Sequence, residues 1–88
     1  MRPEDFGIKN YTREDDGSIS VDGNVDLMSQ ELKRIPFRFM KVTGNFICRC
    51  NKLKTLMGCP RKVGGAFSCA DNMLKNLVGG AKYSRKFF

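Results

Sequence analysis

Residues 42–62 read VTGNFICRCNKLKTLMGCPRK, and this stretch decides the fold because the segments on either side repeat its pattern. Residues 21–41 (VDGNVDLMSQELKRIPFRFMK) and residues 63–83 (VGGAFSCADNMLKNLVGGAKY) align with it without a gap, at a period of 21 residues. The matched columns are Val21/Val42/Val63, Gly23/Gly44/Gly65, Val25/Phe46/Phe67, Leu27/Cys48/Cys69, Gln30/Asn51/Asn72, Leu32/Leu53/Leu74, Lys33/Lys54/Lys75 and Ile35/Leu56/Leu77. A fixed period of this kind predicts a repeated structural unit.

Each unit reads as a strand followed by a turning coil. Val42, Gly44, Phe46 and Cys48 alternate with more polar residues, and this period of two predicts one strand with a buried face. The later spacing of the leucine columns suits a coil that bends repeatedly. Stacked coils would place their strands side by side in a parallel sheet, with the apolar columns forming a continuous core.

The amide column, Gln30, Asn51 and Asn72, calls for a structural role. A tight bend leaves backbone N–H and C=O groups without partners, and an amide side chain can both donate to and accept from them. We predict that these side chains bond to the backbone of their own turn and of the neighbouring coil. Because Gln30 is one methylene longer, we expect looser bonding there.

The apolar-x-apolar-x-x-Asn-x-Leu-x-x-Leu pattern of residues 46–56 resembles the leucine-rich repeat, and residues 25–35 and 67–77 fit the same frame. More closely, IKNYTREDDGSISVDGNVDL, KVTGNF, LMGCP and KVGGAFSCADN resemble leucine-rich-repeat-like proteins common in bacteriophage genomes, whose repeat reads roughly VGGDFDCSNNxLTSLEGCPxx. This resemblance, from Ile8 to about Tyr83, implies a phage origin but no reaction. With the repeats it predicts a mainly β fold, a short right-handed leucine-rich-repeat-like solenoid of three coils with a parallel sheet.

Three parts of the chain follow from this pattern. Residues 1–20 should form an N-terminal cap, a hairpin around the acidic turn at Asp16-Gly17 with a short helical turn at Pro3–Phe6 before it. Residues 21–83 hold the three repeats, 21–41, 42–62 and 63–83. Residues 84–88 place Ser84, Lys86 and Phe88 on the valine, glycine and phenylalanine columns of a fourth, truncated strand. This C-terminal edge either caps the core or offers a surface for self-association.

Charge divides the chain into two unequal parts. Residues 1–31 hold three basic and eight acidic residues, whereas residues 32–88 hold thirteen basic residues and one acid, Asp71. Such an imbalance predicts an acidic partner surface or a nucleic acid, with a solvated basic face as the alternative. We also expect neither secretion nor a membrane span, because the N-terminus lacks an apolar signal segment and no apolar window is long enough.

The residues that usually carry catalysis are missing or unpaired. There is no histidine, and the four cysteines follow C-x-C-x8-C-x9-C, which lacks the paired knuckles of a zinc site. Cys48, Cys59 and Cys69 read as buried apolar thiols, whereas Cys50 is off-column and close to basic residues. Asp22-x-Asn24-x-Asp26 lacks the glycine and the closing glutamate of a calcium loop. We therefore predict no enzyme activity, no metal and no cofactor.

Without a catalytic or metal-binding motif, the surface of the molecule is the candidate for function. Replacements relative to the phage pattern run towards positive charge or apolar side chains, which suggests specialisation for a partner. We expect the loops and one flank, not the sheet face, to carry partner binding. The candidate residues are Lys33, Arg34, Arg49, Lys52, Lys54, Arg61, Lys62 and Lys75.

Three functions fit this sequence. The first is a phage-encoded module that inhibits or redirects an acidic host protein or a nucleoprotein defence complex, such as a CRISPR effector, in the cytoplasm of the infected bacterium. The second is direct nucleic-acid binding by the basic residues of segment 33–86, which predicts a steep dependence on salt. The third is a structural or virion accessory module.

Overall fold

The computed structural model describes residues 2–75, residue 80 and the backbone of residues 86–87. This described part is mainly β, as predicted, with one short 3-10 helix, η1 (Pro3–Phe6), near its start. The strands are β1 (Tyr11–Arg13), β2 (Ile19–Val21), β3 (Val25–Asp26), β4 (Phe39–Val42), β5 (Phe46–Ile47), β6 (Lys62–Val63), β7 (Ala66–Ser68) and β8 (Lys86–Phe87).

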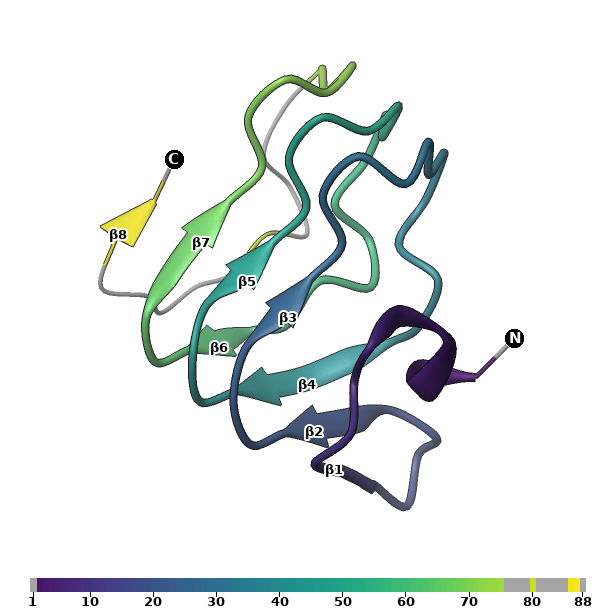
Figure 1. Cartoon of the computed structure of the whole chain (residues 1–88), viewed down its shortest axis with the longest axis vertical. Helices are drawn as coiled ribbons and strands as arrows, with labels where there is room; N and C mark the ends of the chain where they lie inside the picture. Colours follow the sequence, from purple (N-terminus) through teal and green to yellow (C-terminus); the bar gives the residue numbers. More distant parts are fainter. Residues whose placement is uncertain (1, 76–79, 81–85, 88) are drawn as a thin grey trace.

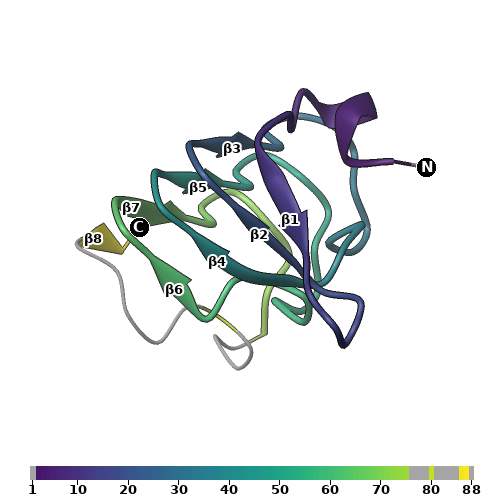
Figure 2. The same ribbon diagram turned by 90° about the horizontal axis from the view of Figure 1, so that it is seen from below.

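The strands form two sheets. The first sheet has the order β1-β2-β4-β6 and the second the order β3-β5-β7-β8. Among the described strands β1 and β2 pair antiparallel and the other pairs are parallel, which confirms the predicted parallel pairing. Figure 1 shows β3, β5 and β7 side by side, and Figure 2 shows β2, β4 and β6 in the same order beneath them.

Residues one period apart are direct neighbours in both sheets. Val21 pairs with Val42 and Val42 with Val63 in the first sheet. In the second sheet Phe46 lies between Val25 and Phe67. The 21-residue period read from the sequence is therefore the spacing between paired strands.

The single strand predicted from Val42 to Cys48 is wrong, because the chain turns a corner between β4 and β5. A Cβ on Gly44 would lie 2.2 Å from Asn24 Oδ1 and 2.7 Å from the Gly23 carbonyl oxygen, so the corners of neighbouring coils are in close contact. Asn24 Oδ1 accepts from the backbone N–H of Asn45 at 2.8 Å. Asn45 Oδ1 accepts in turn from the N–H of Ala66 at 2.8 Å. These amides fix the corner that divides each strand into two.

The core runs between the two sheets. Phe46 and Phe67 are fully buried and stack with their ring centroids 5.6 Å apart, and Phe39 packs edge-on against Phe46. In the leucine column, Leu53 is fully buried, as predicted, whereas Leu32 and Leu74 are half-buried against the core. The difference follows from position, because only the middle coil has a repeat on both sides.

The N-terminal segment forms an antiparallel hairpin along the edge of the first sheet. Tyr11 pairs with Val21 and Arg13 with Ile19. In the turn, the Asp16 carboxylate accepts from the N–H of Ser18 at 3.0 Å and from its hydroxyl at 2.6 Å. These hydrogen bonds lower the pKa of Asp16. The hairpin and η1 stand where the sequence predicts a hairpin and a helical turn.

At the other end, β8 pairs with β7 one residue out of the predicted register. Phe87, not Phe88, is the partner of Phe67, and Lys86 is the partner of Ala66. The paired residues of β7 and β8 are therefore one position closer in sequence than the repeat period. The predicted positions of Ser84 and Phe88 lie outside the described residues.

In each coil, the turn after the strand of the second sheet contains a residue in the left-handed backbone conformation. Ser29, Cys50 and Asp71, one period apart, have φ values of 57°, 58° and 58°.

Asparagine enters this left-handed region more readily than cysteine. We expect Cys50→Asn to raise the free energy of unfolding by about 0.5–1 kcal/mol, read as a rise of a few degrees in Tm. Cys50→Ala is the control, because it keeps the backbone strain and should bring no gain; an equal gain in both variants would contradict this account.

Candidate functional site

The structure brings four of the eight predicted binding residues together. Lys33, Lys52 and Lys54 line one hollow of about 250 Å³ with Met73. Arg34 follows Lys33 directly and lines the next hollow. Lys75 is exposed and lies one period after Lys54, but it does not line these hollows.

The loops that carry these side chains follow β3, β5 and β7 and lie next to one another at the top of Figure 1. The N–H of Lys52 donates to the Leu32 carbonyl at 2.8 Å, and the N–H of Met73 donates to the Leu53 carbonyl at 2.8 Å. Asn51 Oδ1 adds bonds from the N–H groups of Gln30 and Leu32, at 3.0 and 2.9 Å. The backbone beneath the lysines is therefore held by bonds from coil to coil.

Three adjoining hollows form what we call the basic groove. The first is the three-lysine hollow, the second (about 630 Å³) is lined by residues 31–36, and the third (about 370 Å³) is lined by residues 34–38 with Thr55, Met57 and Gly58. Lys33 belongs to the first two hollows, and residues 34–36 belong to the second and third. The hollows therefore lie next to one another along one stretch of chain, from the tip after β3 to the start of β4.

The groove is strongly basic. Its walls hold Lys33, Arg34, Arg38, Lys52 and Lys54, against one carboxylate, Glu31. Arg38 is engaged elsewhere, because its guanidinium lies 3.5 Å from the Asp16 carboxylate and donates to the Asp16 carbonyl. For the other four basic side chains, residues 2–75 show no ion pair within 4.0 Å. These four charges are available to a partner.

The remaining predicted site residues lie elsewhere. Lys62 was expected in a loop but belongs to β6, where it is the direct neighbour of Lys41 on β4. Arg61 precedes β6, and its N–H donates to the Met40 carbonyl at 3.2 Å. The prediction was wrong because each coil has a second strand, which the alternation of residues 42–48 does not reveal.

Arg49 lies on the outer side of the second sheet. With Ile47, Ala66, Ser68 and Ala70 it lines a hollow of about 300 Å³. Its guanidinium approaches the Asp71 carboxylate at 3.9 Å, so its charge is partly balanced. Ser68, although it lines this hollow, is only 3% exposed.

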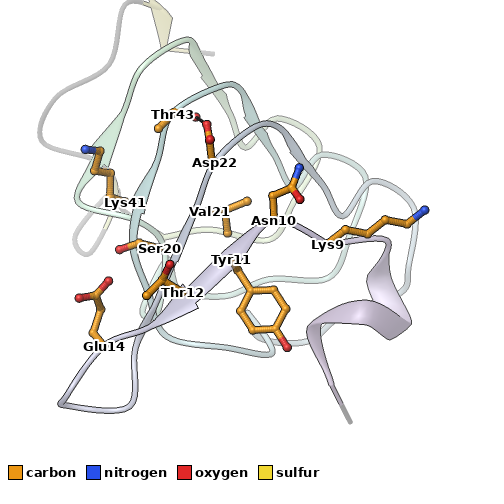
Figure 3. Close-up of a pocket in the computed structure, with 10 residues that line it drawn as sticks. All are labelled: Lys9, Asn10, Tyr11, Thr12, Glu14, Ser20, Val21, Asp22, Lys41 and Thr43. Carbon is orange, nitrogen blue, oxygen red and sulfur yellow. Dashed lines mark hydrogen bonds between the residues drawn. The ribbon is translucent and has the colours of Figure 1, made fainter.

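A polar pocket of about 590 Å³ lies on the outer face of the first sheet, beside the hairpin (Figure 3). Two lysines, Lys9 and Lys41, and two carboxylates, Glu14 and Asp22, line it, so their charges balance. The Asp22 carboxylate accepts from the Thr43 hydroxyl at 3.0 Å. This mixed lining lacks the excess charge of the basic groove.

Three of the four cysteines are buried, as predicted, and Cys50 is exposed. A hydrogen bond with Cys48, together with burial, raises the pKa of the Cys59 thiol, and burial raises that of Cys69. Both thiols are therefore protonated at neutral pH. Within the described part of the chain, no three Cys, Asp or Glu side chains are placed to hold a metal ion.

Sequence reasoning missed the apolar half of the basic groove. Met57 is 78% exposed and Met73 57% exposed, and each lies in one of its hollows. Phe37 is half-buried between Phe6 and Phe39 and lines the third hollow. The signal available in the sequence was the presence of a methionine at each of two turns of the coil, where a polar residue would be expected.

The described residues contain no helix with the length and apolar character needed to cross a membrane. Comparisons of the chain with models of protein families, with curated proteins and with solved structures find no match.

Proposed function

We propose that the chain is a non-enzymatic binding module that holds an anionic partner against the basic groove. The observation that carries this proposal is the convergence of Lys33, Lys52 and Lys54 on one hollow, with Arg34 beside it. Two unit charges about 4 Å apart repel each other by about 1 kcal/mol in water. A negatively charged partner would turn this repulsion into attraction and would be drawn to the groove by its field.

The proposed architecture is a short leucine-rich-repeat-like solenoid. Its support is that each full repeat contributes one strand to each sheet, paired with the strand one period away. Asparagine side chains bridge successive coils in the same way at successive positions. Repeat proteins of this type present extended surfaces to their partners, and their stacked loops hold side chains at fixed spacing.

For the partner we propose an acidic host protein or a nucleoprotein defence complex, met in the cytoplasm of an infected bacterium. The resemblance to phage repeat proteins and the small size of the chain support this choice. The second candidate is nucleic acid, which the same excess of basic side chains would attract. Capture of partners from bacterial lysate, with and without nuclease, separates the two: a partner lost on nuclease treatment indicates nucleic acid.

A charge-reversal pair tests the role of the groove. We expect Lys33→Glu/Lys54→Glu to weaken binding to labelled polyglutamate by about tenfold or more, because two attractive contacts become repulsive. The matched control is Lys41→Glu/Lys62→Glu, which changes the net charge equally on the first sheet. Fluorescence anisotropy measures both variants. An equal loss in the two variants would show that net charge, and not the groove, holds the ligand.

A further inference from the structure

The basic groove has an apolar floor that electrostatic attraction alone does not require. Ile35 and Pro36 line its second and third hollows, Phe37 lines the third, and the exposed Met57 and Met73 line its two outer hollows. Exposed apolar side chains rimmed by charge mark a contact surface for a partner. Methionine suits this position because its flexible thioether adapts to partners of different shape.

We infer that the basic groove binds an extended acidic peptide segment of a partner protein, whose carboxylates meet the lysine rim and whose interspersed apolar side chains pack on Met57 and Met73. This inference rests on the proposed function and deepens it by naming the class of ligand. An extended segment fits because the three hollows follow one another along residues 31–38, each sharing lining residues with the next.

The two kinds of contact lie close together in the first hollow. Met73 lines this hollow together with Lys33, Lys52 and Lys54, so an apolar side chain seated on Met73 enters a hollow that three lysines line. A peptide in which carboxylates flank an apolar residue matches this arrangement. In the third hollow, Arg34 and Met57 repeat the combination.

A nucleic-acid strand fits this groove less well. Proteins that bind single strands without sequence preference stack the bases on exposed aromatic rings. Among the described residues, Phe37 is the one aromatic side chain that lines the groove, and it is engaged edge-to-face by Phe6 and Phe39, with ring centroids 5.6 and 6.2 Å away. Methionines in the outer hollows offer apolar contact, which a phosphate backbone does not use.

The backbone under the groove is organised before a ligand arrives. Asn51 and Asn72 bind the turns beneath the lysines, and the N–H of Leu53 donates to Asn72 Oδ1 at 3.0 Å. A surface held in this way loses little backbone freedom on binding. Discrimination between one ligand and another should therefore come from the side chains along the groove.

The test uses three labelled probes with the full chain: a peptide of repeating Glu-Glu-Leu units, the same peptide with every leucine replaced by serine, and an oligo-dT of matched charge. We expect the leucine peptide to bind about tenfold or more tightly than the serine peptide, because each seated leucine removes apolar surface from water. Met57→Ser and Met73→Ser should each reduce that advantage about threefold and leave serine-peptide binding unchanged. Met28→Ser, at a methionine that is 43% exposed and outside the groove, is the control and should have no effect.

The outcomes separate the two proposals. Equal binding of both peptides, with no effect of the methionine variants, would overturn the peptide inference and leave the basic module standing. Tighter binding of oligo-dT than of either peptide would overturn the inference in favour of nucleic acid. If no probe binds at all, the proposed function fails together with the inference.

Discussion

Asn51→Ala should lower the free energy of unfolding by about 3–5 kcal/mol, a large part of the total stability of a domain of this size. The Asn51 side chain is 7% exposed. Its Oδ1 accepts from two backbone N–H groups, and its Nδ2 donates to the carbonyls of Leu27, Cys48 and Arg49 at 2.8, 3.1 and 3.1 Å. Alanine would leave all five backbone groups without this partner. The bonds to the Leu27 and Cys48 carbonyls are buried, so these two groups bear the full cost of about 1–3 kcal/mol each, and the part-buried groups lose less.

The same column provides its own controls. Gln30 occupies the equivalent position in the first coil, but it is exposed and donates only a long hydrogen bond, 3.5 Å, to the Met28 carbonyl. Gln30→Ala should therefore change stability by less than about 0.5 kcal/mol. Asn72→Ala should fall between the two, because Asn72 is half-buried and accepts from Leu53. Urea unfolding followed by circular dichroism gives this order, and equal effects of Asn51→Ala and Gln30→Ala would contradict the structural role of the column.

The role of the amide column could be predicted because it depends on local chemistry. A tight turn with buried backbone groups needs a side chain that donates and accepts, and Asn51 does both in the structure. The looser bonding expected at Gln30 is observed for the same reason, since the longer side chain stays in solvent. The repeat period likewise fixed the neighbours of each strand, such as Val42 between Val21 and Val63.

The corner within each repeat could not be predicted from alternation alone. Val42, Phe46 and Cys48 are all buried, so their spacing satisfies a straight strand as well as two strands that meet at a bend. The distinguishing contact is between coils: the N–H of Asn45 donates to Asn24 Oδ1. Such a contact becomes visible only once the coils are stacked.

The candidate site was predicted in part for a similar reason. Lys33 and Lys54 share a column, so their proximity followed from the period, and the structure places both in one hollow. Lys62 could not be located without knowing that each coil has a second strand. The exposure of Met57 and Met73 depends on how neighbouring coils pack against each other, which no residue pattern within one repeat specifies.

Gly64→Ala should cost about 2–3 kcal/mol and lower Tm by about 10–20 °C. An ideal Cβ at Gly64 would lie 2.1 Å from the carbonyl oxygen of Thr43, which is a backbone atom of the preceding coil. Relief requires β6 to move away from β4, and that movement stretches the bonds from the N–H of Gly64 to Val42 and from the N–H of Gly65 to Gly44, both 2.9 Å. The corner of the third coil would then separate from the corner of the second.

Two further variants show whether the backbone contact is the cause. Gly17→Ala, in the hairpin turn, has no atom within 4 Å of the added Cβ and costs only the strain of φ +87°, about 1 kcal/mol. At Gly65 the nearest atom is Asn45 Oδ1, at 2.1 Å, so Asn45→Ala should recover part of the stability that Gly65→Ala loses. Gly64→Ala has no such rescue, because its obstacle is main chain. Thermal unfolding of these variants measures the effect. If Gly64→Ala lowers Tm no more than Gly17→Ala does, the stacked corners can move apart at little cost in stability, and the close contact between coils does not limit this fold.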